Sequence, residues 1–134
     1  MGRKESYRLL PFSIDQDFDT EVIYEIFRKS KIPQMLVEDL MGLQPALLNR
    51  YTRKYFQSAD ANYRVTLDSE LQYYRIDPHN NTFLNNWTDE RTIVLELKYN
   101  HDNDQLAADV SSYFPFRMTK SSKYVNGIQK LYLF

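Results

Sequence analysis

The chain has 134 residues and a formal net charge of −1, from 17 basic and 18 acidic side chains. This length suits a single domain spanning residues 1–134, and the balanced charge gives no overall positive field that would attract nucleic acid. The sequence has no cysteine and no apolar run near the roughly 20 residues that cross a bilayer. We therefore expect a cytoplasmic protein without disulfides, thiolate metal sites or a membrane span.

The first half of the chain predicts a short strand followed by two helices. Residues 6–10 (SYRLL) are expected to form the strand. Two segments, 20–29 and 33–40, predict helices because their apolar side chains follow helical spacing: Val22, Ile23, Ile26 and Phe27 in the first, and Leu36, Val37 and Leu40 in the second. Gly42 is expected to end the second helix.

The second half of the chain predicts strands and one further helix. Residues 47–58 and 63–76 alternate in polarity, with an interruption near Asp68 and Ser69 in the second segment. Residues 77–91 are rich in Asn, Asp and Pro and predict a loop. The remaining segments predict a strong strand (92–99), a short helix (102–113), and a turn with a final aromatic strand (121–133). This order of elements favours an α+β fold with a mostly antiparallel sheet.

The strand segments carry one apolar side and one charged side. In the stretch TIVLELKYN (92–100), Glu96 and Lys98 share a face because side chains alternate along a strand. Arg64 and Asp68 share a face of the segment 63–76 in the same way, and Arg53 lies between two tyrosines on its own segment. Each of these segments therefore carries cations on its charged side, and two of the segments also carry an acidic side chain there.

Two interpretations of the charged side stay open at this point. It can face water, which is the usual fate of one face of an antiparallel sheet. It can instead line a polar cavity covered outside by helices. Several cations directed into one cavity repel each other, so that arrangement makes physical sense when an oxygen-rich anion such as phosphate binds there. A carboxylate among the cations can hold a divalent metal that bridges phosphate oxygens.

Four stretches carry a resemblance to a known family: YTRKYFQS (51–58), YRVTLDSELQYY (63–74), IVLELKY (93–99) and SSKYVNG (121–127). In this order and spacing they resemble the C-terminal half of the VTC domain, over roughly residues 45–128. The resemblance implies part of a triphosphate-tunnel β-barrel of the CYTH type, with helices packed outside. The opening GRKESYRL resembles the segment that follows the family's mid-domain E-x-K strand, so the resemblance implies that the family's first half would precede this chain.

The resemblance also implies roles for individual residues. Glu96 matches the family's metal-binding glutamate, and the implied metal is Mg²⁺ or Mn²⁺. The implied phosphate-binding residues are Arg53, Arg64, Lys98 and Lys123, with weaker matches at Lys120 and Lys4 and a guess at Arg8. For the weaker matches an ordinary surface cation is the alternative. Asp68 is expected either to pair with Arg64 or to cap the end of its strand.

Eukaryotic members of the family resemble a polyphosphate polymerase, which moves the terminal phosphoryl of a nucleoside triphosphate onto polyphosphate. The resemblance therefore implies phosphoryl transfer or triphosphate hydrolysis, and we expect this chain by itself to be a weak or inactive catalyst. A module that binds polyphosphate or another polyanion without turnover is the alternative, and a solvated scaffold is a third. The open sheet edges of half a tunnel also predict a homodimer that completes the sheet. His79 and His101 are expected to have no role.

Overall fold

The structure is a computed structural model that describes residues 3–100, 104–115 and 119–132, without the side chains of 104–107. The chain forms two compact units. The first comprises Met1–Leu48 and Tyr74–Asn85, and the second comprises Asn49–Tyr73 and Asn86–Phe134. Every strand and the last two helices belong wholly or mainly to the second unit, and each unit is described here by itself.

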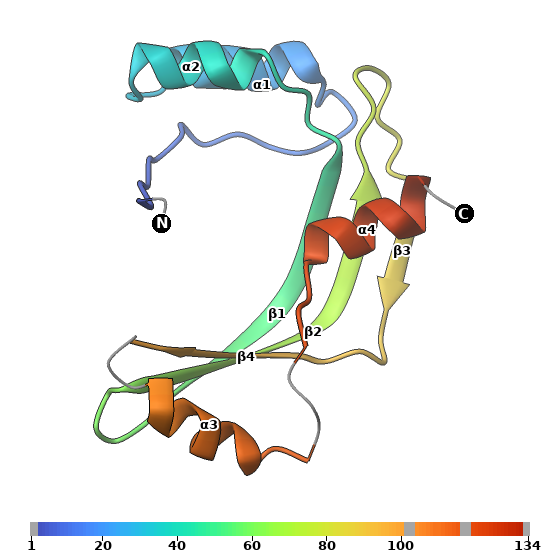
Figure 1. Ribbon diagram of the computed structural model, residues 1–134. Coiled ribbons are helices and arrows are strands. Elements are labelled where there is room, and N and C mark those ends of the chain that lie inside the picture. The colour runs from blue at the N-terminus through green and yellow to red at the C-terminus, as the bar shows by residue number, and fades with distance from the viewer. Residues whose placement is uncertain (1–2, 101–103, 116–118, 133–134) are drawn as a thin grey trace. The chain divides into compact units, whose positions relative to one another are not determined.

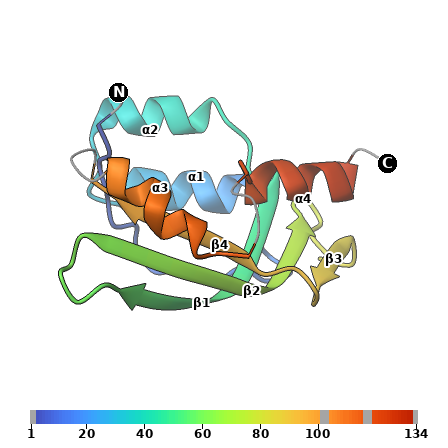
Figure 2. The same cartoon turned by 60° about the horizontal axis from the view of Figure 1, so that its bottom comes forward.

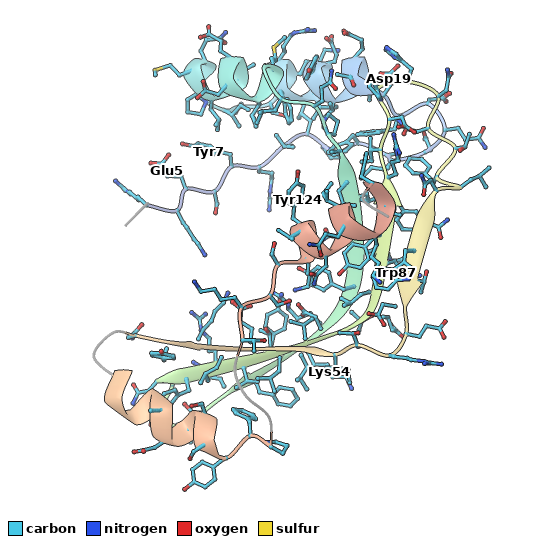
Figure 3. All side chains as sticks on the ribbon, turned by 45° about the vertical axis from the view of Figure 1, so that its right-hand side comes forward. Glu5, Tyr7, Asp19, Lys54, Trp87 and Tyr124 are labelled. Atoms are coloured by element: carbon cyan, nitrogen blue, oxygen red, sulfur yellow. The ribbon has the colours of Figure 1, made fainter. Side chains whose placement is uncertain are left out.

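The first unit packs two helices and a loop around a small apolar core. Helix α1 (Thr20–Lys29) begins after Asp19, whose carboxylate accepts a hydrogen bond from the Val22 N–H at 2.9 Å, as N-cap residues do. Helix α2 (Gln34–Met41) packs against α1 (Figure 3). The buried core residues of this unit are Phe18, Ile23 and Ile76. The loop is fastened to them by Asn81, which donates to the Phe18 carbonyl at 2.8 Å.

The second unit is built on an antiparallel sheet of four strands (Figure 1). The strands are β1 (Leu47–Gln57), β2 (Tyr63–Arg75), β3 (Asn86–Asp89) and β4 (Val94–Tyr99), followed by α3 (Asp104–Ser112) and α4 (Lys123–Tyr132). β2 is the central strand, because it pairs with β1, β3 and β4. Figure 2 shows β2 between β1 and β4.

The buried side of β2 changes register at Glu70. Before this residue Thr66 and Asp68 are buried, and after it Leu71 and Tyr73 are buried. The change from even to odd positions requires one extra residue, and Glu70 has the left-handed φ of 54° that marks a β-bulge. The four buried residues therefore lie on one side of the sheet, which we call the Asp68 face.

Helix α4 covers part of the Asp68 face. Leu131 of α4 is 2% exposed, and Leu71 and Tyr73 beneath it are similarly buried. Trp87 of β3 stacks on Tyr73 with ring centroids 5.5 Å apart, and Lys130 of α4 places its Nζ 4.8 Å from the Trp87 ring. These contacts form the apolar core of the second unit.

Most of the predicted elements are confirmed. The first predicted helix has the observed bounds, the second differs by one residue and ends at Gly42, and the helix predicted at 102–113 is α3. The strands predicted at 47–58, 63–76 and 92–99 are β1, β2 and β4. The interruption predicted near Asp68 and Ser69 is the bulge at Glu70. The α+β fold with an antiparallel sheet is confirmed.

Three of the predicted elements are wrong. Residues 6–10 form no strand, because no strand of the described residues pairs with them, and the Leu10 N–H donates to Ser30 Oγ instead. The segment 77–91, expected to be a loop, contains β3, which pairs with β2 although it is rich in Asn and Asp. The final strand expected within 121–133 is helix α4, in which Gly127 and Leu131 are buried one turn apart.

The described strands form an open sheet and do not close into a barrel. The expectation that all helices pack outside the charged side is also wrong, since α4 lies on the Asp68 face. No helix in the described part of the chain has the length and apolar character needed to cross a membrane. Whether this sheet belongs to a tunnel stays a prediction.

Candidate phosphate-binding site

The pairing of β2 with β4 brings the predicted site residues onto one face. Arg64 is directly opposite Lys98, and Thr66 is directly opposite Glu96. Cross-strand neighbours in an antiparallel pair project from the same side of the sheet. The common face that strand alternation predicts for Arg64, Glu96 and Lys98 is therefore confirmed, and it is the Asp68 face. Their role in binding stays a prediction.

An open pocket of about 350 Å³ lies on this face. It is lined by Arg53, Tyr55, Phe56, Gln57, Arg64, Thr66 and Lys98. A neighbouring pocket of about 500 Å³ shares Arg64 and Lys98 and continues toward the β1–β2 turn. The two pockets together make a groove on the sheet surface in which Arg64 and Lys98 are the common cations.

Arg64 and Lys98 form an unbalanced pair of like charges. The only carboxylate that the structure places near Lys98 is that of Glu96, at 3.6 Å, and both side chains are about half exposed. Arg64 makes no ion pair with any described residue. Like charges directly opposite each other on neighbouring strands are destabilising, so this position is suited to an anion bound between the two cations.

The pocket also contains a buried hydroxyl without a partner. Thr66 is 5% exposed, and its Oγ1 has no hydrogen-bond partner among the described residues. A buried hydroxyl left unpaired costs about 1–3 kcal/mol. The hydroxyl can donate to an anion oxygen in the pocket, because a hydroxyl rotates to suit its acceptor.

Asp68 gathers two further predicted site residues into a buried ion cluster. Its side chain is 1% exposed. Oδ1 accepts from Arg53 Nε at 2.5 Å, and Oδ2 accepts from Arg53 Nη2 at 2.7 Å and lies 2.5 Å from Lys123 Nζ. The Tyr51 ring lies close to both cations, 5.1 Å from Arg53 Cζ and 4.7 Å from Lys123 Nζ. The expected pairing of Asp68 with Arg64 is therefore wrong, because Arg53 and Lys123 occupy its oxygens.

The ion cluster shifts the ionisation of its members. The hydrogen bond from Arg53 is the main cause that holds the pKa of Asp68 below its ordinary value, with Lys123 contributing against the effect of burial. The same hydrogen bond raises the pKa of Arg53 above its already high ordinary value. Asp68 is therefore ionised at neutral pH, and its carboxylate is held between two basic side chains.

Comparison with protein families matches residues 28–132 to the VTC domain. This match covers most of the 134-residue chain. The chain belongs to the VTC domain family. The resemblance noted for four short stretches is thereby confirmed, and the match also includes α2. No curated protein matches the chain.

In this VTC domain the residues around Glu96 fit a divalent metal only in part. Glu96 is a half-exposed carboxylate on the same face as Arg64 and Lys98, and no group of three metal-ligating side chains occurs among the described residues. Magnesium needs only one or two protein carboxylates when phosphate oxygens complete its coordination. Glu96 can therefore hold a metal together with a phosphate ligand, but not as a complete protein site.

The weaker site predictions lie apart from the pocket or cannot be placed against it. Lys120 is exposed and does not line the pocket. Lys4 and Arg8 are exposed residues of the first unit, and their predicted roles stay predictions. His79 is exposed, and His101 lies outside the described residues. Tyr124, on α4, is 60% exposed (Figure 3).

Sequence reasoning missed two features of this site. It gave Thr66 no role, although the residue lies between Arg64 and Asp68 on the same strand face. It also missed that Lys123 begins a helix. Ser122 carried the available signal, because its carbonyl and hydroxyl oxygens accept from the Asn126 and Val125 N–H groups and serine is a preferred helix N-cap.

Proposed function

We propose that this VTC domain binds polyphosphate or the triphosphate of a nucleotide on the Asp68 face. The phosphates would lie in the groove between β1 and β4, with Arg64 and Lys98 as their direct ligands. Arginine and lysine both bind phosphate oxygens by charge-assisted hydrogen bonds. Membership of the family supports a phosphate-polymer ligand.

One observation carries the proposal: Arg64 and Lys98 are directly opposite each other in the β2–β4 register and line the same pocket. Glu96 lies 3.6 Å from Lys98, but no described carboxylate pairs with Arg64, so the two neighbouring cations repel each other in the absence of a ligand. A phosphate between them converts that repulsion into two charge-assisted contacts. The unpaired Thr66 hydroxyl would add a neutral donor at the same place.

The reaction that this site would serve is phosphoryl transfer. Such transfer depends on positioning and charge neutralisation more than on a covalent nucleophile. The pocket offers cations, with Glu96 beside Lys98 on the same face, but no nucleophile–base pair among its lining residues. A bound Mg²⁺ or Mn²⁺ would neutralise charge on the phosphates. Glu96 would hold that metal, while Arg64 and Lys98 orient the phosphate chain.

Binding without turnover is the second candidate function. It is favoured by the ion cluster, because Arg53 and Lys123 are already paired with Asp68. Of the four strongest phosphate ligands that the sequence predicts, only Arg64 and Lys98 have side chains free of this cluster. A site with half its expected cations available is better suited to holding a polyanion than to stabilising a transition state.

Tripolyphosphate titration by calorimetry tests the binding proposal. We expect the unmodified chain to bind, and we expect Arg64→Gln and Lys98→Gln each to weaken binding roughly tenfold because each removes one charge-assisted contact. Lys54→Gln is the matched control: Lys54, labelled in Figure 3, neighbours Arg53 on β1, is exposed, and does not line the pocket. Equal losses from all three variants would mean that only general charge matters.

A turnover assay separates the two functions. The chain is incubated with ATP and Mn²⁺, and the release of phosphate and the growth of polyphosphate are measured. Turnover that disappears in Glu96→Gln would support phosphoryl transfer. Tripolyphosphate binding without turnover would support the binding module.

A further inference from the structure

The ion cluster pairs Arg53 and Lys123 with Asp68, and it also leaves part of the Arg53 side chain able to contact a ligand. A guanidinium has five N–H donors, and Arg53 uses only Nε and Nη2 toward Asp68. Its Nη1 takes no part in the contact with Asp68, and Arg53 also lines the pocket together with Arg64, Thr66 and Lys98. The two-point contact with a buried carboxylate fixes the plane of the guanidinium, since a bidentate pair is geometrically specific.

The same carboxylate fastens α4 to the sheet. Lys123 is the first residue of α4, a position where a cation is disfavoured by the positive end of the helix dipole. Its ammonium group lies 2.5 Å from Asp68 Oδ2 and 4.7 Å from the Tyr51 ring. Asp68 and Tyr51 together offset the unfavourable position, so the beginning of α4 is held against β1 and β2.

We infer that Asp68 is the positioning residue of the phosphate site. It never contacts the ligand. It holds Arg53 so that Nη1 is presented to a phosphate in the pocket, and it holds Lys123 away from that phosphate. This inference rests on the proposed function, because it concerns how the same pocket recognises tripolyphosphate.

The inference predicts an effect opposite to that of charge alone. Replacing Asp68 with asparagine removes a negative charge beside the pocket, so simple electrostatics predicts tighter binding of an anion. A positioning role for Asp68 predicts weaker binding of tripolyphosphate. Asparagine offers one acceptor oxygen in place of two, so the Arg53 guanidinium is no longer held in a fixed plane.

The experiment measures tripolyphosphate affinity by calorimetry for the unmodified chain, Asp68→Asn and Arg53→Lys, each at a temperature where circular dichroism shows it to be folded. We expect Asp68→Asn to bind tripolyphosphate roughly tenfold more weakly than the unmodified chain. We expect the same of Arg53→Lys, which keeps the positive charge but loses the two-point contact of the guanidinium with Asp68. Glu90→Gln is the control for net charge, because Glu90 is an exposed carboxylate of the second unit that does not line this pocket. It should bind as tightly as the unmodified chain or slightly more tightly.

Each other outcome overturns the inference. Unchanged affinity of folded Asp68→Asn would make Asp68 a purely structural residue, and tighter binding would make it a competitor of the phosphate. If Asp68→Asn does not fold, Arg53→Lys decides, and unchanged affinity there refutes positioning. A chain that binds no tripolyphosphate at all would refute the proposed function as well. Binding that depends on Arg64 but not on Asp68 would refute the positioning role alone.

Discussion

At the scale of single residues, the two neighbouring cations Arg64 and Lys98 lower the stability of the fold but suit the binding of an anion. The two cations are directly opposite each other in the β2–β4 register. Such pairs typically cost a few tenths of a kcal/mol to about 1 kcal/mol. A position that is unfavourable for folding but matched to an anion is what a binding site requires.

The first prediction concerns this repulsion. We expect Arg64→Gln to raise the free energy of unfolding by roughly 0.2–1 kcal/mol without ligand, because the like-charge pair is removed. Urea denaturation at low ionic strength measures the change. It should be absent in a Lys98→Gln background, where the repulsion is already gone, and it should shrink in high salt. A lower free energy of unfolding for Arg64→Gln would show that Arg64 has a stabilising partner.

The second prediction concerns the acid limit of stability. The pKa of Asp68 is lowered in the folded chain, chiefly by the hydrogen bond from Arg53. A carboxyl with a depressed folded pKa contributes stability that is present above its unfolded pKa of about 3.9 and is lost as pH falls through the folded value. We therefore expect the free energy of unfolding to fall steeply below about pH 4.

Urea denaturation between pH 7 and pH 2 checks this dependence. The groups that face Asp68 are Arg53 and Tyr51 from β1 and Lys123 from α4, and its β4 register partner Val94 does not titrate. Asp68→Asn should be less stable at pH 7, by roughly 3–5 kcal/mol if the cluster behaves like other broken buried pairs. Its loss of stability below pH 4 should be shallower, and equal slopes would contradict the prediction.

At the scale of secondary-structure elements, the bulge in β2 decides which side chains meet α4. Glu70 inserts one residue, so that Leu71 and Tyr73 lie on the same face as Asp68. Without the bulge, alternation would direct both apolar side chains to the opposite face. The bulge therefore allows one strand to carry charged ligands at one end and an apolar contact for a helix at the other.

The third prediction tests the bulge. Glu70→Val should disfavour the left-handed φ of the bulge, because a β-branched residue rarely adopts it; uninterrupted alternation would then direct Leu71 and Tyr73 to the opposite face and release α4. Trp87 is the single tryptophan of the sequence and stacks on Tyr73, so its fluorescence should shift to the red. Glu70→Gly is the control, since glycine adopts the left-handed φ and retains the bulge. Native-like fluorescence of Glu70→Val would contradict the prediction.

At the scale of the whole molecule, the sheet is open among the described residues. β1 is an edge strand of 11 residues that pairs with β2 alone, and Tyr55 and Phe56 on it are exposed. Long unprotected edges favour pairing with another strand. This edge is the feature that supports the predicted homodimer.

The fourth prediction is that two copies associate through this edge as concentration rises. Sedimentation velocity over a hundredfold range of concentration should show a shift from monomer to dimer. Hydrogen exchange should show added protection of β1 amides in the dimer. A monomer at the highest concentration, or protection confined to another element, would contradict edge pairing.

Much of the fold could be predicted from local sequence. The first two helices and the strands of the β1–β2 hairpin follow from periodicity, because a buried stripe or side imposes its spacing on the residues that form it. The shared face of Arg64, Glu96 and Lys98 follows from alternation once their strands are neighbours. The errors fall where a local signal competes with a distant partner. Gly127 locally favours a turn but is buried in α4, and the polar residues around Trp87 favour a loop although β2 pairs with that segment.

The sequence by itself determined the charged residues, their alternation along each strand and the family of the domain, since these depend on neighbours within a few positions. Only the tertiary structure decided which charges pair. Asp68 binds Arg53, 15 residues away, and Lys123, which is the first residue of α4. Those contacts depend on strand register, on the bulge at Glu70 and on the placement of α4. The segments that make them are distant in sequence and become neighbours only on folding, so local sequence cannot specify which charges pair.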